Sequence, residues 1–483
     1  MGTRHLVGRS PQLPIQILLA DGSNLELVQW LRVLPNQRYV AKANWQGSTV
    51  LAKLFIGPKA ERNYQRDVSG VELLQGQAIT TPMIIHQEQS LRFCCLLFEF
   101  LDPVENLADA WKRHENEAYL SSHQQDILAR ALQCIAHMHA QGIWQEDLHL
   151  DNLLYHHQKV YVIDGDGIQA EQAGTALSTA KATDNLGVFF AQLPIEVMPY
   201  LRPLMLYYYL VNPASAVDID ELIKVVERVR AWRLRDYLKK TKRDCTLFFA
   251  QISLFGLTIA KRAEYEQQDL AQLLENADHF INQGHIYKTG GAATVAKVIW
   301  NDKPFIIKRY NIKNWRHWLK RFWRPSRAWH SWYEGNRLNF LGIYTPALLA
   351  VKEYRWLGLR GPAWLITDYC AGQDIIAHWA QYKDISPPET ELLALDQLFN
   401  ALIREQISHG DLKGHNIFWQ QGRWLLIDLD AVQQHQKTAS FVKAYAKDRQ
   451  RFLRNWAPDS ALYTLLDQRL PQVHSVCHDK TKG

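Results

Sequence analysis

The sequence predicts an α+β protein made of two successive domains, each with a small β-rich lobe, a helical lobe and a site between them. Three observations predict this fold class. A polar motif occurs twice, stretches with strand-like alternation precede each copy, and segments with helical periodicity flank it. Because long-range self-similarity fixes the number of domains, we expect a first domain over residues 1–275 and a second over residues 276–483.

The duplicated motif is an Asp followed five residues later by an Asn and twelve residues after that by a second Asp. The two copies align without a gap although they stand in opposite halves of the chain. In each, an apolar run ("VYVI" or "WLLI") stands just before the second Asp, which is typical of a short buried strand. The matched residues are Asp147, Asn152, Asp164 and Asp166 in the first copy, and Asp411, Asn416, Asp428 and Asp430 in the second.

The elements around the motif follow the same order in both halves. In the first half we expect strands, a helix, a buried apolar strand, a second helix that stops at Gly142, the motif, and a charged helix. The second half repeats strands, helix, strand, helix and motif. The expected segments are 38–45, 48–56, 62–75, 93–102, 123–142 and 218–241 in the first half, and strands from residue 284, a helix around Glu334, a strand over 363–370 and a helix over 389–406 in the second.

The composition excludes several classes of protein. Apolar residues make up 47% and charged residues 22% of the 483 residues, which is ordinary for a globular protein with large cores. Six scattered cysteines without a C-x-x-C pair indicate neither a disulfide framework nor a zinc site, and so a reducing compartment. The N-terminus lacks the apolar core of a signal peptide, and no run of 18 apolar residues predicts a membrane span. We therefore expect a soluble, cytoplasmic protein.

The chemistry that this motif suits is phosphoryl transfer from a nucleotide. That reaction needs a carboxylate to orient the attacking hydroxyl, oxygen ligands for Mg²⁺ and a cation on the phosphates. The motif matches the D-x-x-x-x-N loop of protein kinases and the metal-binding Asp that follows it. We therefore predict Asp411 and Asp147 as catalytic bases, with ATP and Mg²⁺ as cofactors. The predicted Mg²⁺ ligands are Asn416 and Asp428 in the second domain and Asn152 and Asp164 in the first.

Two further parts of such a site can be assigned upstream of each motif. A strand Lys holds the phosphates, and a Glu on the next helix pairs with it. In the first domain "TVLAKLF" offers Lys53 and "GVELLQ" offers Glu72. In the second domain "PFIIKRY" offers Lys308 and "WYEGNRL" offers Glu334. The interval from this Glu to the motif Asp is nearly the same in both copies, whereas the interval from Lys to Glu is longer in the second domain and indicates an insertion there.

The second domain carries the stronger signal for nucleotide binding. Gly290 and Gly291 in "YKTGGAATVAKV" suit a phosphate-cradling turn before a strand, whereas the first domain has no glycine at the corresponding turn. Lys413, two residues after Asp411, is placed to touch the transferred phosphate, and His149 stands at that position in the first domain. We therefore expect the second domain to be catalytic, and the first to be a second active site or a regulatory one.

A basic, aromatic stretch without any acidic residue runs from Lys303 to Tyr333. It contains nine Lys and Arg and five Trp, and charge of this density indicates a polyanionic partner. Trp interleaved with Arg is typical of nucleic-acid contacts and equally of membrane interfaces with anionic headgroups. We expect the anionic membrane surface, contacted through segment 308–332, and no nucleic acid. The cations available for this contact are Arg316, Lys320, Arg321, Arg324 and Arg327.

In these motifs the chain resembles the lipopolysaccharide core kinase family, the Kdo and heptose kinases of Gram-negative bacteria. The resemblance covers nearly all of the second domain, and the first looks like a diverged sister. It implies a protein-kinase-like fold, and transfer of the ATP γ-phosphate to a core sugar hydroxyl at the cytoplasmic face of the inner membrane. The usual member has one domain, so the tandem departs from the family pattern. The stretches that carry the resemblance are "KRYN" around Lys308, "RPSRAWHSWYEG" and "LGIYTP" between Arg324 and Pro346, "HGDLKGHNI", "LIDLD" and "KDRQRFLRNW" from Lys447.

Other functions share parts of this pattern. A protein Ser/Thr kinase and a small-molecule phosphotransferase of the aminoglycoside or choline type use the same kind of loop. A nucleotide-binding pseudokinase scaffold keeps the loop without turnover. The basic stretch favours a substrate in an anionic membrane, so the leading hypothesis is an ATP-dependent kinase that phosphorylates heptose or Kdo in the lipopolysaccharide core glycolipid.

Overall fold

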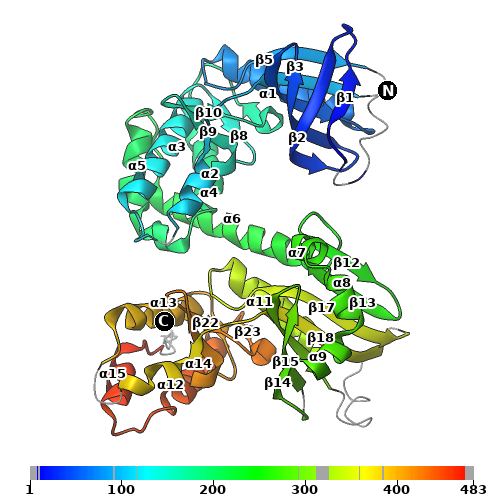
Figure 1. Cartoon of the computed structure of the whole chain (residues 1–483). Helices are drawn as coiled ribbons and strands as arrows, with labels where there is room; N and C mark the ends of the chain where they lie inside the picture. The colour runs from blue at the N-terminus through cyan, green and yellow to red at the C-terminus, as the bar shows by residue number, and fades with distance from the viewer. Residues whose placement is uncertain are drawn as a thin grey trace. The chain divides into compact units, whose positions relative to one another are not determined.

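The computed structural model describes residues 8, 11–90, 93–115, 117–291, 293–311, 326–357, 359–382 and 386–473, and they confirm the α+β class. These residues form two compact units, Met1–Trp232 and Arg233–Gly483. Helix α6 (Ile219–Lys240) carries the chain from the first unit into the second (Figure 1). In both units a large antiparallel sheet is followed along the chain by a mainly helical part.

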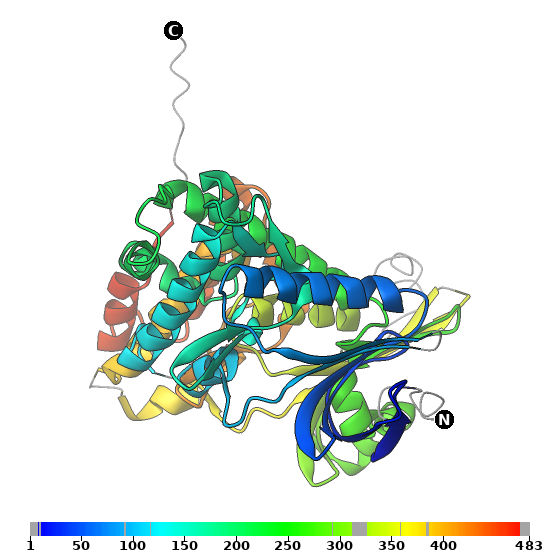
Figure 2. The ribbon, with the colours of Figure 1, turned by 90° about the horizontal axis from the view of Figure 1, so that it is seen from above.

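The first unit begins with a six-stranded antiparallel sheet in the order β1-β2-β3-β4-β6-β5. Its strands alternate in burial, so one face closes a core with Ala41, Ala52 and Leu97 while the other packs against helix α1 (Ala60–Gly76). Figure 2 shows α1 lying along the strands. The strands are β1 (Ile15–Leu18), β2 (Asn24–Leu34), β3 (Arg38–Trp45), β4 (Ser48–Phe55), β5 (Ile84–Gln89) and β6 (Cys94–Glu99).

The helical part of the first unit has its own apolar core. Its longest helix, α3, begins after Ser121, whose hydroxyl accepts a hydrogen bond from the Gln124 amide, and it ends just before Gly142. Gly142 has a φ of +74°, and a Cβ there would lie 2.2 Å from the Gln172 carbonyl oxygen, so only glycine fits this turn. The elements are β7 (Glu105–Asn106), α2 (Leu107–Arg113), α3 (Ser122–Ala140), β8 (Ile143–Gln145), β9 (Leu153–His156), β10 (Lys159–Val162), β11 (Ile168–Ala170), α4 (Thr179–Phe190) and α5 (Leu201–Tyr209).

The second unit contains a seven-stranded antiparallel sheet in the order β12-β13-β17-β18-β16-β15-β14. Strands β12 and β13 come from residues that the sequence-based division at 275/276 assigns to the first domain. They join the second sheet because β13 pairs with β17, for example Ile259 with Val351. The elements are β12 (Phe248–Ile252), β13 (Gly256–Lys261), α7 (Arg262–Gln267), α8 (Leu270–Glu275), α9 (Ala277–Gln283), β14 (His285–Lys288), β15 (Ala293–Trp300), β16 (Lys303–Tyr310), α11 (Arg327–Phe340), β17 (Leu348–Trp356) and β18 (Leu359–Asp368).

The helical part of the second unit surrounds another apolar core, to which Phe399, Leu426 and Tyr445 contribute. The helix expected over 389–406 is present as α13. In the described part of the chain, no helix has both the length and the apolar character to cross a membrane. The elements are β19 (Gln373–Asp374), α12 (Ile375–His378), α13 (Glu389–Arg404), β20 (Ile407–Ser408), β21 (Ile417–Gln420), β22 (Arg423–Leu426), β23 (Gln433–Gln434), α14 (Thr438–Leu453) and α15 (Ala461–Arg469).

Candidate active site

The two copies of the motif fold in the same way. In the first unit Leu153 of β9 pairs with Val162 of β10, and in the second the aligned residues, Ile417 of β21 and Leu426 of β22, pair in the same register. The short ladders β8–β11 and β20–β23 follow the same alignment. The strand pair that the sequence predicts inside each motif is therefore confirmed, and the gapless repeat is a structural repeat.

The second Asp of each motif has an unusual backbone conformation. Asp164 has φ +67° and Asp428 has φ +60°, so both non-glycine residues lie in the left-handed region. Such residues are uncommon, and they concentrate at functional sites where the surrounding structure holds them in place. A backbone hydrogen bond helps here, because Ile427 N donates to the Asn416 carbonyl oxygen at 3.0 Å, just before Asp428.

Lys308 in the second unit is the centre of a cluster of ion pairs. Its Nζ lies 2.5 Å from Asp428 Oδ1 and 2.8 Å from Asp430 Oδ1. Asp430 Oδ1 also accepts hydrogen bonds from the Tyr310 hydroxyl at 2.7 Å and the Ser331 hydroxyl at 2.9 Å. Burial acts to raise the pKa of Asp428, but the ammonium of Lys308 outweighs it and lowers that pKa. Lys308 is therefore held where the two acids of the motif meet.

The predicted pairing of Lys308 with Glu334 does not occur. Glu334 is buried on α11 and pairs with Arg337 one turn later, with Arg337 Nε 2.8 Å from Glu334 Oε2. Lys308 is bonded instead to the motif acids. The residue of α11 that contacts this cluster is Ser331, through Asp430. The sequence assigned the right helix but the wrong side chain, because it matched an acid to a Lys by residue type.

The loop of the second motif holds its Asp and Asn together. Asn416 Nδ2 donates to the Asp411 carbonyl oxygen at 2.8 Å and lies 3.3 Å from Asp411 Oδ2. Lys413 Nζ lies 3.3 Å from Asp411 Oδ2. Arg451 of α14 lies on the other oxygen, with Nη1 3.1 Å from Asp411 Oδ1. Asp411 is thus positioned between two half-exposed cations.

A buried acid that the sequence analysis assigned no role fixes this loop. Asp448 of α14 is 3% exposed, and its Oδ2 accepts hydrogen bonds from the backbone N–H groups of His409 at 2.7 Å and Gly410 at 3.0 Å. The buried His409 ring contacts the Ile427 carbonyl oxygen at 3.0 Å, and burial lowers the pKa of this His. Both Asp448 and Arg451 belong to the stretch "KDRQRFLRNW", which contributes to the family resemblance, but the sequence offered no reason to assign either residue a role.

In the first unit the strand Lys pairs with an acid of α1, but not with the predicted one. Lys53 Nζ lies 2.8 Å from Asp67 Oδ2 and 3.5 Å from Asp164 Oδ1, and Asp67 is fully buried. Glu72 is exposed. The missed signal was spacing, because the interval from Asp67 to Asp147 equals the interval from Ser331 to Asp411. Asp67 and Ser331 therefore occupy corresponding positions.

The loop of the first motif resembles that of the second. Asn152 Nδ2 donates to the Asp147 carbonyl oxygen at 2.9 Å, and His149 Nε2 lies 3.3 Å from Asp147 Oδ2. Gln145 corresponds to His409 and does a similar job, since its Nε2 donates to the Ile163 carbonyl oxygen at 2.8 Å. Asn185 of α4 donates to the Gln145 carbonyl oxygen at 2.7 Å, which ties this loop to the helical part.

The remaining predicted residues lie partly inside and partly outside the described chain. Gly290 and Gly291 form the exposed turn between β14 and β15, with φ values of +77° and +63° that favour glycine. Residues 312–325, which carry five of the nine Lys and Arg of the basic stretch, lie outside the described residues. Trp332, at the end of segment 308–332, is fully buried against Phe248, so this Trp belongs to the core and not to a membrane-binding surface.

The donor set of the second motif fits a divalent cation. Asp428 and Asn416 offer a carboxylate and a carboxamide, the oxygen ligands that Mg²⁺ prefers. They are carried on adjacent backbone segments by the hydrogen bond from Ile427 to Asn416. The Asp428 side chain is 40% exposed, so solvent reaches it.

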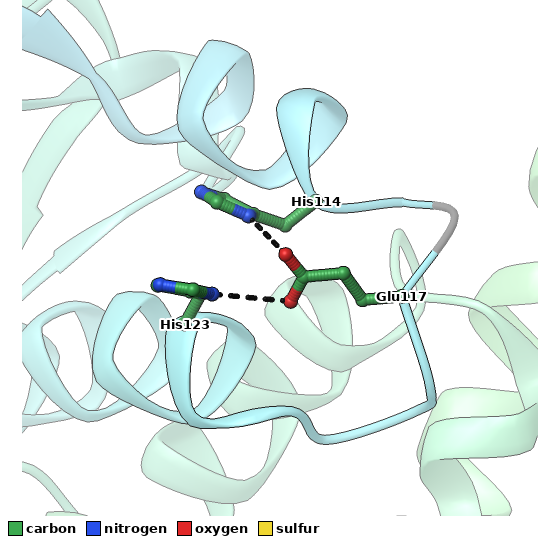
Figure 3. Close-up of side chains that lie close together, drawn as sticks. All are labelled: His114, Glu117 and His123. Carbon is green, nitrogen blue, oxygen red and sulfur yellow. Dashed lines mark hydrogen bonds and ion pairs between the residues drawn. The ribbon is translucent and has the colours of Figure 1, made fainter.

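A separate cluster of two His and one Glu lies at the start of α3 in the first unit (Figure 3). Glu117 contacts His114 Nδ1 at 2.7 Å and His123 Nδ1 at 3.2 Å. Hydrogen bonds from Ser121 and from both His lower the pKa of Glu117 to about 2. The two rings stack 4.3 Å apart with only 17° between their planes. A metal ion lies near the plane of each imidazole that binds it, so this arrangement suits two hydrogen bonds to one carboxylate.

One comparison with known proteins, a match to a family model, covers this site. Residues 287–461 match the model of the "Lipopolysaccharide kinase (Kdo/WaaP) family". No curated protein matches the chain. A solved structure described as "WaaP in complex with acyl carrier protein" aligns with 43% of this chain and 86% of that chain, at 14% identity and a TM-score of 0.32. The matched segment lies in the second unit and contains the whole second motif, so this part of the chain is similar to the lipopolysaccharide kinase (Kdo/WaaP) family.

Proposed function

We propose that the second unit transfers the γ-phosphate of ATP to a hydroxyl of a heptose or Kdo sugar in the lipopolysaccharide core. The observation that carries this proposal is the bonded set around Asp411. Its loop is held to Asn416, and Asn416 is held through Ile427 to the Asp428–Lys308 pair. The family match over residues 287–461 supplies the class of acceptor.

Each side chain of this set has a role that its chemistry suits. Asp411 accepts the proton of the sugar hydroxyl and orients it for attack. Lys308 has three N–H donors, two of them directed to Asp428 and Asp430, so the third is available to a phosphate oxygen. Lys413 and Arg451 lie beside Asp411, where they stabilise charge on the transferred phosphoryl group.

Asn416 and Asp428 are the residues that would hold Mg²⁺. When bound, the ion neutralises phosphate charge and aligns the γ-phosphate with the acceptor. The protein's own contribution is a loop whose parts are already bonded to one another, so little reorganisation is needed when the substrates arrive. Asp448 contributes by holding the backbone ahead of Asp411.

The acceptor is a lipid-linked sugar, so we propose that the protein works at the cytoplasmic face of the inner membrane as a peripheral protein. The support is the charge of the sequence from Lys303 to Tyr333, which has no acid to oppose its nine basic residues. Attraction of this kind to anionic headgroups is screened by salt. Binding of the full chain to vesicles with anionic lipid should therefore weaken when the salt concentration rises.

The test is phosphate incorporation from labelled ATP into purified core glycolipid. Asp411→Ala should lower the rate about 10²–10⁴-fold, the usual effect of losing a general base. Asp459→Ala, which removes an exposed acid elsewhere in the second unit, is the matched control and should leave the rate unchanged. Equal rates for the parent and Asp411→Ala would contradict the proposal.

Two further arms identify the acceptor and the contribution of the first unit. Core glycolipids that end in Kdo or in heptose, a protein substrate and an aminoglycoside are offered in parallel. Phosphorylation of the protein or the aminoglycoside alone would replace the lipopolysaccharide hypothesis by one of its alternatives. Asp147→Ala shows whether the first motif takes part, because a rate loss comparable to that of Asp411→Ala would make both units necessary.

A further inference from the structure

The two units differ in what neutralises the paired acids of the motif. In the first unit Arg38 Nη1 lies 3.1 Å from Asp164 Oδ1 and 3.3 Å from Asp166 Oδ2, so one guanidinium bridges both carboxylates. The Arg38 side chain is only 10% exposed. Lys53 adds a contact to Asp164 at 3.5 Å. Burial acts to raise the pKa of Asp164, but Lys53, Arg38 and Arg32 outweigh it and lower that pKa, so this carboxylate is ionised.

The strand register shows which residue takes the place of Arg38 in the second unit. On β3, Arg38 lies two residues before the residue that pairs with Lys53. On β15, Ala293 lies two residues before the residue that pairs with Lys308. Ala293 is buried and carries no charge. The second unit therefore has an alanine where the first unit has a buried arginine.

This difference changes which cation a ligand meets at the motif acids. Among the described residues of the second unit, Lys308 is the cation in contact with both Asp428 and Asp430, and Lys288 adds a longer-range interaction with Asp428. In the first unit Arg38 contacts both corresponding acids, whereas the strand Lys is shared between Asp164 and a third acid, Asp67. A divalent cation at Asp164 would have to lie beside that guanidinium, and like charges at such a distance repel. The first site thus does not fit the Mg²⁺ that the sequence predicts for it.

We propose that the first unit binds the phosphates of a nucleoside triphosphate without a divalent cation, through Arg38. A guanidinium carries five N–H donors in a planar fork that matches phosphate oxygens. The two contacts to Asp164 and Asp166 both use Nη1. Arg38 thereby neutralises phosphate charge, as the metal ion does in a phosphotransferase. Nucleotide binding by the first unit is then independent of the reaction proposed for the second unit.

The experiment measures ATP binding to the full chain by calorimetry, in buffer with Mg²⁺ and in buffer with EDTA. The double substitution Lys308→Ala, Asp428→Ala removes nucleotide binding by the second unit. The experiment therefore tests the first unit alone, and its result does not depend on whether the glycolipid assay supports the function proposed for the second unit. In this background ATP should bind equally well in both buffers. Arg38→Ala, which installs the residue found in the second unit, should weaken binding in EDTA about 10- to 100-fold, the effect of losing a charge-assisted hydrogen bond.

Two further variants show whether a loss of binding comes from the Arg38 charge or from a general effect of the substitution. Arg38→Gln keeps much of the side-chain volume without the charge, so it should weaken binding in EDTA as Arg38→Ala does, even if the alanine variant fails to fold. Arg202→Ala is the matched control, because Arg202 is an exposed cation of α5 that pairs with Asp220 and not with the motif acids, and it should change affinity little. ATP binding that disappears in EDTA, that survives both Arg38 substitutions in EDTA, or that is absent in both buffers overturns the proposal.

Discussion

The stability of the first unit should depend on the protonation of His139, a residue of α3 that is fully buried. Its ring contacts the Tyr208 hydroxyl and Asn185 Oδ1, each at 3.0 Å, and Asn185 in turn donates to the Gln145 carbonyl oxygen. This network connects the helical core to the loop of the first motif. Burial lowers the pKa of His139 from 6.5 to about 4.

Because the pKa of His139 is lower in the folded protein than in the unfolded chain, the first unit should lose stability as the pH falls. Between pH 6.5 and 4 the unfolded chain binds a proton at residue 139 while the folded chain does not, so acid favours unfolding in this window. Each tenfold difference in proton affinity is worth about 1.4 kcal/mol, so the full effect is about 3 kcal/mol and about 2 kcal/mol of it is lost by pH 5. The contribution is fully present above pH 7.

The assay is urea unfolding at pH 7.5 and pH 5.0, followed by pulsed hydrogen exchange of the peptides that cover α3, which separates the first unit from the second. His139→Gln is neutral at both values, so its free energy of unfolding should fall about 2 kcal/mol less than that of the parent between them. Other groups titrate in both proteins and cancel. An identical pH dependence for parent and variant would refute the reasoning, because it would mean that the folded protein protonates His139 as readily as the unfolded chain.

Two more predictions concern close contacts at the sites. A Cβ at Gly70 of α1 would lie 1.9 Å from the Gly165 carbonyl oxygen. Gly70→Ala should therefore destabilise the first unit by about 1–3 kcal/mol in urea unfolding. Gly76→Ala on the same helix is the control and should not destabilise it, because the space around Gly76 is open. Asp448→Ala removes the acceptor of two backbone N–H groups just ahead of Asp411, and a loop displaced by about 1 Å should lower kcat on core glycolipid about 10²-fold. Unchanged stability of Gly70→Ala, or unchanged kcat of Asp448→Ala with normal folding, would count against these contacts.

The fold and the motif loops were predictable because they depend on local patterns. An apolar run followed by an acid at fixed spacing was enough to place the strand pair and Asp428, and helical periodicity placed α13 at its first residue. The repeat supported these predictions, because two copies of a motif with identical spacing rarely arise by chance. The same spacing placed Asn416 against Asp411, where the structure has it.

The ion pairs were less predictable because they depend on which way each helix turns relative to its sheet. Glu72 and Glu334 have the right residue type and similar spacing, but Glu72 is exposed and Glu334 pairs with Arg337. Asp67 contacts Lys53 because it lies on the face of α1 that packs against the sheet and the motif. Arg38 was missed because nothing in a strand sequence shows that its first residue reaches two acids far along the chain.

Because Asp67 and Ser331 occupy corresponding positions, the connections between strand and helix in the two units can be compared in length. The chain takes a longer path from Lys308 to Ser331 than from Lys53 to Asp67, and the additional residues fall in the stretch rich in Arg and Trp. The shorter connection shows that the same span can be bridged without them. Trimming the longer connection to the length of the shorter one should therefore give an enzyme that still phosphorylates a soluble, delipidated acceptor yet no longer associates with vesicles, a separation of the two activities in one variant.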